Sequence, residues 1–154
     1  MIYILSTHKM TIVCVSGYFD PIHVGHLEYL NRSKELAGPN GKLVVIVNND
    51  HQAQLKKGKS FMKCKERCEI LRNIRCVDEV VESIDIDRTV CKTLESILPR
   101  PNIFANGGDQ FNDRIPESVV CNKYDIKLVD SLGDKIQSSS WLIKDMRKGE
   151  IMDN

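Results

Sequence analysis

The stretch MTIVCVSGYFDPIHVGHLEYLNRSKELAG, residues 10–38, decides the fold because a strand, a short connection and a helix follow one another in it. Residues 10–17 are mostly apolar and β-branched, which is typical of a buried strand. Over 23–38 apolar side chains recur at helical spacing, and Gly38 and Pro39 mark the end of the helix. The stretch therefore predicts a strand that passes directly into an amphipathic helix.

The same alternation continues along the rest of the chain. We expect further strands over 42–50, 77–83, 102–109 and 125–131. We expect further helices over 63–76, 87–99 and 138–150, with Asp87 as the N-cap of the second. A partly helical loop is expected over 51–60, and a short irregular helix before the last strand. This order predicts the α/β class, with a doubly wound parallel sheet that has helices on both faces.

The composition is that of an ordinary globular protein. Hydrophobic residues make up 42% and charged residues 28% of the 154 positions, and no linker or repeat divides the chain. We therefore expect a single domain over 1–154. A net charge of +1 gives no reason to expect nucleic acid or membrane as a partner. The chain has neither a membrane-length apolar run nor a basic secretion signal, so the expected location is cytoplasmic.

The cysteines are expected to be reduced and to serve as small apolar residues. No C-x-x-C pair occurs among them. Cys64 and Cys68 lie four residues apart on an expected helix, but no second close pair completes a zinc site. We therefore expect no metal ligands in the chain. The six cysteines are Cys14, Cys64, Cys68, Cys76, Cys91 and Cys121.

Polar segments gather where the expected strands end. They are residues 17–26, 48–50, 107–109 and 138–140. In doubly wound parallel sheets, ligands bind outside the carboxyl ends of the strands, near a switch in strand order. The convergence of these segments predicts a ligand site at that edge.

Two histidines, His23 and His26, stand at the start of the first expected helix. Gly17 allows the backbone to come close to a ligand, and the free N–H groups of a helix start favour an anion. The two imidazoles would then donate hydrogen bonds to a phosphate. One alternative is that the histidines cap the helix or pack in the core. Another is a metal site, which lacks a third ligand at an obvious spacing.

Three further groups suit phosphate chemistry. Ser138–Ser140 would bring hydroxyl and backbone donors to the outer phosphates of a nucleotide, although a single serine cap explains one of them. The basic stretch with Lys56, Lys57 and Lys59 is either a solvated surface or a mobile loop that closes on a triphosphate. Asp109 follows two glycines and is free for a ligand hydroxyl, a base or a metal.

Over about residues 10–145, which we expect to be the core, the chain resembles the cytidylyltransferase-like branch of the nucleotidyltransferase superfamily. The hallmark is HVGH at 23–26, preceded by GYFD. An H-x-G-H sequence alone also occurs in class I aminoacyl-tRNA synthetases. Here it is followed in order by ERCEILRNIRCVDEVVES (66–83), NGGD (106–109) and QSSS (137–140), and this ordered set is specific.

The resemblance implies a Rossmann-like fold and the transfer of a nucleoside monophosphate from CTP or ATP to a phosphorylated acceptor, with Mg²⁺ and release of pyrophosphate. It implies a homodimer as well. It assigns catalytic roles to His23, His26, Lys57 and Ser139. It assigns nucleotide contacts to Gly17, Tyr18, Phe19, Asp20, Gly25, Lys56, Lys59, Arg67, Asn106, Gly107, Asp109, Gln137, Ser138 and Ser140.

The acceptor is expected to be a phosphorylated sugar or polyol. ILPRPNIFANGGD (97–109) is similar to sugar-phosphate adenylyltransferases, and IRCVDEVVES (74–83) to polyol-phosphate cytidylyltransferases. FDPIHVGH (19–26) also echoes nicotinate mononucleotide adenylyltransferase, and pantetheine phosphate is a further alternative acceptor. Tyr18 and Gly133 depart from the family pattern, so a nucleotide-binding sensor without turnover is the alternative function.

Overall fold

The computed structural model describes residues 10–107 and 115–130 and contains one five-stranded sheet. All strand pairs are parallel, and the strand order is β3-β2-β1-β4-β5. The strands are β1 (Ile12–Gly17), β2 (Lys42–Val47), β3 (Glu79–Glu82), β4 (Ile103–Ala105) and β5 (Lys127–Val129). The predicted parallel α/β sheet is therefore confirmed.

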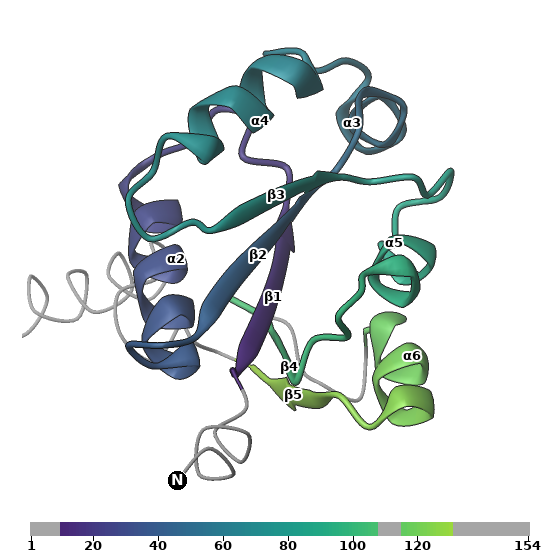
Figure 1. Ribbon diagram of the computed structural model, residues 1–154. Coiled ribbons are helices and arrows are strands. Elements are labelled where there is room, and N and C mark those ends of the chain that lie inside the picture. The colour runs from purple at the N-terminus through teal and green to yellow at the C-terminus, as the bar shows by residue number, and fades with distance from the viewer. Residues whose placement is uncertain (1–9, 108–114, 131–154) are drawn as a thin grey trace, which may run out of the picture.

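Helices cover both faces of this sheet (Figure 1). α2 and α4 pack on one face, and α5 and α6 pack on the other. α3 lies beyond the end of β2 and leads into α4. The helices are α2 (Val24–Ala37), α3 (Asp50–Lys57), α4 (Cys64–Arg72), α5 (Cys91–Ser96) and α6 (Glu117–Tyr124). The sheet is thus doubly wound, as the sequence predicts.

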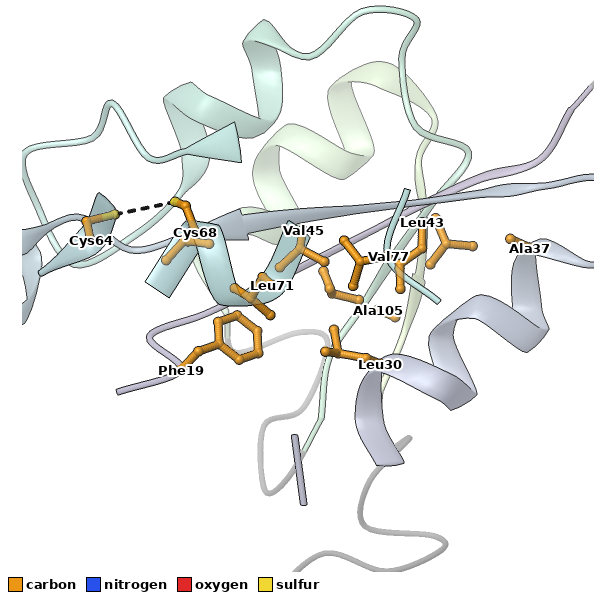
Figure 2. Packing of buried hydrophobic residues seen from close by; sticks show 13 residues of the cluster. Phe19, Leu30, Ala37, Leu43, Val45, Cys64, Cys68, Leu71, Val77 and Ala105 are labelled. Atoms are coloured by element: carbon orange, nitrogen blue, oxygen red, sulfur yellow. Dashed lines mark hydrogen bonds between the residues drawn. The ribbon is translucent and has the colours of Figure 1, made fainter. Parts of the chain in front are cut away.

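The core forms one layer on each face of the sheet. In β1, Val13 and Val15 pack with α2 and α4, whereas Ile12 and Cys14 pack with α5 and α6. Figure 2 shows the first layer, in which Leu30 of α2 and other apolar side chains gather against the strands. Because both faces of β1 and β2 are buried, these strands read as continuous apolar runs.

Residues 51–60 were expected to be a partly helical loop, and their helical part is a regular helix, α3, that ends before Gly58. Asn49 accepts a hydrogen bond from the Gln52 backbone N–H, and the Gln52 side chain accepts one from the Asn49 N–H. This reciprocal capping box starts the helix, and Gly58 ends it in the left-handed conformation with φ of 89°. Apolar periodicity missed the helix because Gln52 and Ala53 are its only buried residues.

The helix expected over 87–99 is shorter and begins at Cys91. Asp87 is not its cap, because its carboxylate accepts a hydrogen bond from the Thr89 N–H at 2.9 Å. The second and third N–H groups of α5 are bound by Asp85, which accepts from Lys92 and Thr93 at 2.9 Å each. The acidic residue that caps this helix therefore lies two positions before the one that the sequence suggested.

All six cysteines are free thiols, as expected. Four are buried, whereas Cys76 and Cys91 are half-buried. Within residues 10–107 and 115–130, no helix has both the length and the apolar character needed to cross a bilayer.

Candidate active site

The carboxyl ends of β1 and β4 meet at the point where the strand order switches. β1 occupies the centre of the sheet, with β2 on one side and β4 on the other. The connections that leave β1 and β4 run to α2 and α6, on opposite faces. A crevice for a ligand opens at such a switch point. Residues 17–26 and Asn106–Gly107 lie there, as the sequence predicts.

The side chains of His23 and His26 both accept hydrogen bonds from backbone N–H groups at the start of α2, and so they cap the helix. The Nδ1 atom of His23 accepts from the Gly25 N–H at 3.1 Å, and the Nδ1 atom of His26 accepts from the His23 N–H at 3.1 Å. Their rings stack, with centroids 3.9 Å apart and planes inclined by 27°. The capping alternative is therefore correct, and it is compatible with phosphate binding because only one nitrogen of each ring is used.

The capping bonds decide which nitrogen of each ring carries the proton. Because each Nδ1 accepts a hydrogen bond, each neutral ring must hold its hydrogen on Nε2. Burial, and then the neighbouring His23, lower the pKa of His26 to about 4. His26 is therefore a neutral Nε2–H donor at physiological pH. Two such donors beside the amides of a helix N-terminus make a site for a phosphoryl group.

Gly17 and Phe19 form the floor beneath these histidines. The Phe19 ring is 2% exposed and meets His26 edge-on, with ring centroids 5.0 Å apart. A Cβ atom on Gly17 would lie 2.9 Å from that ring, so glycine is required to make room for Phe19. The Phe19 ring therefore fills the space beside Gly17, and the expected nucleotide contact at position 19 stays a prediction.

Asp20 joins the H-x-G-H turn to the loop that follows α3. Its fully buried carboxylate accepts from the backbone N–H groups of Phe61 and Met62 at 2.7 Å each, and from Lys57 at 2.8 Å. Burial opposes ionisation, but the hydrogen bonds from Lys57, Met62 and Phe61 outweigh it and lower the pKa of Asp20. Asp20 is therefore an ionised residue that positions the loop after α3, and the expected nucleotide contact at position 20 stays a prediction.

Arg67 organises the same region from α4. Its guanidinium donates to the backbone carbonyls of Met62, Tyr18 and Asn48 at 2.7–2.8 Å, and to the Asp50 carboxylate at 3.0 Å. The side chain is completely buried. All three of its nitrogens are engaged by protein, so Arg67 holds the ends of β1 and β2 in place. The expected contact of Arg67 with nucleotide stays a prediction.

A cationic cluster faces the Tyr18 ring. Lys56 Nζ lies 4.3 Å from the ring centroid. Burial, and then repulsion by Arg88 and Lys57, lower the pKa of Lys56. Burial also raises the pKa of Tyr18, and Arg88 partly offsets this rise. The Tyr18 hydroxyl is buried and has no hydrogen-bond partner in the described part of the chain.

Arg88 was absent from the sequence-based candidates, although a signal for it existed. It follows β3, whose carboxyl end lies on the same edge as those of β1 and β2. Applying the strand-end rule to β3 would have selected it. Converging positive charges of this kind suit a phosphate ligand.

The end of β4 supplies Asn106 and Gly107. The Asn106 amide nitrogen is buried and has no partner among the described residues, so a donor is held ready at this edge. A Cβ atom on Gly107 would approach the Tyr29 ring to 3.1 Å, and Tyr29 donates to the Ala105 carbonyl at 2.6 Å. A side chain at position 107 would crowd the Tyr29 ring, and both Asn106 and Gly107 remain candidates for ligand binding.

The other expected residues divide into two groups. Gly25 takes part in the α2 cap, and Lys59 is exposed just after α3. Asp109, Gln137 and Ser138–Ser140, with the expected helix over 138–150, lie outside the described residues.

Comparison with known proteins extends these observations. The model of the cytidylyltransferase-like family matches residues 14–146. The FAD synthase of Methanothermus fervidus is 42% identical over 95 residues, which are 62% of this chain and 63% of that enzyme. This match thus spans less than two thirds of the relative. The FAD synthase of Methanobrevibacter smithii is 31% identical over 154 residues, covering 94% of this chain and 99% of that enzyme.

Two other relatives carry different names. The bifunctional protein HldE of Hydrogenovibrio crunogenus is 34% identical over 119 residues, which cover 75% of this chain and 23% of HldE. Among solved structures, the lipopolysaccharide core biosynthesis protein of Thermoplasma volcanium is similar, with a TM-score of 0.64 and 26% identity. That match covers 80% of this chain and 97% of the other.

Proposed function

The chain belongs to the cytidylyltransferase-like family of nucleotidyltransferases, and we propose that it transfers the AMP group of ATP to FMN, forming FAD and pyrophosphate. The donor and acceptor are suggested by the FAD synthases that it resembles, one of them along almost the whole chain. FMN carries its phosphate at the end of a ribityl chain. Its reacting end is therefore a polyol phosphate, the acceptor class that the sequence suggested.

The observation that carries the proposal is the paired cap at the start of α2. Each Nδ1 atom is engaged by a backbone N–H, so the two Nε2–H groups are donors held in fixed positions. In the proposed reaction an oxygen of the FMN phosphate attacks the α-phosphorus of ATP. A new phosphorus–oxygen bond forms as the bond to the β-phosphate oxygen breaks, and pyrophosphate leaves. His23 and His26 would stabilise the negative charge that develops at the α-phosphate.

The basic residues would bind the remaining phosphates. Lys57 is paired with Asp20, whereas Lys56 and Arg88 lie near each other without a carboxylate partner among the described residues. A phosphate between Lys56 and Arg88 would relieve their repulsion. We therefore assign the direct phosphate contact to Lys56 and a positioning role to Lys57, which ties the end of α3 to the Asp20 turn.

Mg²⁺ would supply charge neutralisation on the phosphates when it is bound. Asp20 is the one carboxylate of the GYFDPIHVGH segment, and its oxygens are engaged by Phe61, Met62 and Lys57. The segment thus fits a metal that is carried by the triphosphate, and not one held in a protein cage. This chain's part is to bind the phosphates around it.

A matrix of donors and acceptors tests the proposal. ATP and CTP would each be incubated with FMN, glycerol 3-phosphate, a sugar 1-phosphate, nicotinate mononucleotide and pantetheine phosphate, and pyrophosphate release would be followed. We expect release with ATP and FMN, together with FAD resolved by chromatography. Release only with a sugar or polyol phosphate would replace the acceptor and keep the reaction class.

The sensor alternative predicts a different result. A catalytically silent sensor would bind ATP in calorimetry but would not exchange labelled pyrophosphate into ATP with any acceptor. The expected homodimer stays a prediction, and light scattering of the purified chain measures it.

A further inference from the structure

Two buried thiols and a carboxylate converge behind the candidate active site. Cys64 and Cys68 lie one turn apart on α4, and their sulfur atoms are 3.9 Å apart (Figure 2). Glu82, the last residue of β3, completes a group whose ligand atoms all lie within 4.8 Å of one another. Within residues 10–107 and 115–130, it is the one group of three such side chains that converges so closely.

We propose that Cys64, Cys68 and Glu82 form a binding site for Zn²⁺ that is separate from the phosphate site. Zn²⁺ takes thiolate sulfur at about 2.3 Å in tetrahedral geometry, which places two sulfur ligands roughly 3.8 Å apart. The two thiols already have this separation. A shift of the Glu82 carboxylate would bring one of its oxygens to a zinc–oxygen distance of about 2.0–2.2 Å. As an exposed side chain on an edge strand, Glu82 is free to shift in this way.

The charges around the group favour a cation. Glu82 forms no ion pair within the described part of the chain, whereas Glu79, at the other end of β3, pairs with Lys42. Its negative charge faces two thiols that are 1% and 2% exposed. A divalent cation would compensate this charge. The buried Arg67 on the same helix would offset the net charge of −1 that two thiolates, one carboxylate and one Zn²⁺ leave.

Binding of Zn²⁺ would release protons from the two thiols. Each thiol must lose its proton before its sulfur coordinates, so one Zn²⁺ displaces two protons to solvent and no electrons move. Cys64 at present directs its S–H toward the Asn48 carbonyl at 3.6 Å, and that carbonyl also accepts from Arg67. The bound ion would replace this weak contact and link α4 to β3 at the edge of the sheet.

This site could not be predicted from the sequence, because the third ligand lies on another secondary-structure element. Cys64 and Cys68 lack a second close pair, and Glu82 is 14 residues beyond Cys68 on a different secondary-structure element. The pairing becomes visible only when α4 packs against β3. The site thus differs from the histidine pair, for which spacing along the chain was sufficient.

Cobalt substitution tests the proposal on the full reduced chain. We expect one equivalent of Co²⁺ to produce a sulfur-to-cobalt charge-transfer band, Zn²⁺ to abolish the band, and about two protons to be released per ion. Cobalt bound to His23 and His26 or to ATP would give no such band. Absence of the band in the wild-type chain, with six free thiols confirmed by titration, would overturn the proposal.

Variants locate the ligands. Cys68→Ala should remove the band, and Glu82→Gln should weaken Co²⁺ binding about tenfold or more while the exposed position keeps the fold intact. Cys76→Ser is the matched control, because Cys76 is a half-buried thiol outside the group, and it should keep wild-type affinity. Wild-type affinity in both Cys68→Ala and Glu82→Gln would refute this ligand set. If Cys68→Ala fails to fold, the Glu82→Gln result decides alone.

Discussion

The start of α2 and the loop between α3 and α4 form two sides of the same site, but they are held in place by different kinds of contact. At the start of α2, the capping bonds join residues two and three positions apart. In the loop, Asp20 binds the N–H groups of Phe61 and Met62, which are 41 and 42 positions away. Arg67 reaches the Tyr18 carbonyl across 49 positions.

The two regions therefore differ in the role that we expect of their side chains, which is ligand binding in the first region and positioning in the second. The histidines are proposed to donate to a ligand through Nε2–H, and their positions depend mainly on their own helix start. Asp20 and Arg67 are buried and bind protein groups from several elements, so they set the distance between that helix start and the lysines of α3. Substitutions in the first region should therefore change turnover more than stability, and substitutions in the second should do the reverse.

Removing the Arg67 guanidinium should give the largest effect. Arg67→Met keeps the length of the side chain but leaves three backbone carbonyls and the Asp20 and Asp50 carboxylates without their shared cation. We expect a loss of about 3–5 kcal/mol in the free energy of unfolding, because breaking a buried ionic network strands its partners. Urea denaturation followed by circular dichroism measures this loss.

Arg72→Met is the matched control on the same helix. Arg72 is exposed and makes only a surface pair with Glu69 at 3.7 Å, which contributes about 0–1 kcal/mol. Equal stabilities of the two variants would show that the long-range contacts of Arg67 do not hold the loop.

Removing the Nε2–H of His26 should give the largest effect on catalysis. We expect His26→Ala to lose about 2–4 kcal/mol of transition-state stabilisation, the size of one preorganised donor. The measurement is kcat for pyrophosphate release with the active donor and acceptor pair. Asn31→Ala, an exposed change one turn and a half further along α2, should leave kcat unaltered. An unchanged kcat in His26→Ala would remove His26 from the mechanism.

The same contrast explains how far the sequence could predict the molecule. Apolar runs in β1 and β2 predicted the sheet, because strands that are buried on both faces must be apolar throughout. The spacing of His23 and His26 predicted their convergence, because a helix places residues three apart on the same side. Both are local properties, which a single sequence records directly.

Properties that depend on distant contacts were missed. Asp20 and Arg67 are of residue types that often bind ligands. Nothing near them in sequence shows that Asp20 will accept a hydrogen bond from Met62, or that Arg67 will donate one to Tyr18. The sequence predicted α3 only in part. Its start is fixed by a capping box between Asn49 and Gln52, and the helix has no apolar stripe that periodicity would show. The residue type alone therefore cannot separate a positioning group from one that binds ligand.

Substitutions at His23 can separate capping from catalysis. Asparagine is among the best N-cap residues, so His23→Asn should keep the bond from the Gly25 N–H, whereas His23→Ala loses it. We expect His23→Ala to be about 1 kcal/mol less stable than His23→Asn in thermal or urea unfolding. Both variants lack the Nε2–H and should have similarly low kcat. Full activity in His23→Asn would mean that the cap is the whole contribution of this histidine.

The last expected effect is a dependence of stability on pH. Because the pKa of His26 falls from 6.5 to about 4 on folding, the unfolded chain binds a proton at pH values where the folded chain does not. This contribution to stability is therefore fully present above pH 6.5 and is lost as the pH falls from 6.5 through about 4. His26→Gln, whose amide oxygen can take over the cap, removes the titrating group.

The difference in melting temperature between wild type and His26→Gln isolates this contribution from other groups that titrate in the same range. We expect the wild type to lose more of its melting temperature than the variant between pH 7 and pH 4.5. Parallel curves would show that His26 titrates normally in the folded protein. In that case His26 would carry a positive charge in mildly acidic solution, and the start of α2 would hold phosphate through an ion pair instead of through neutral donors.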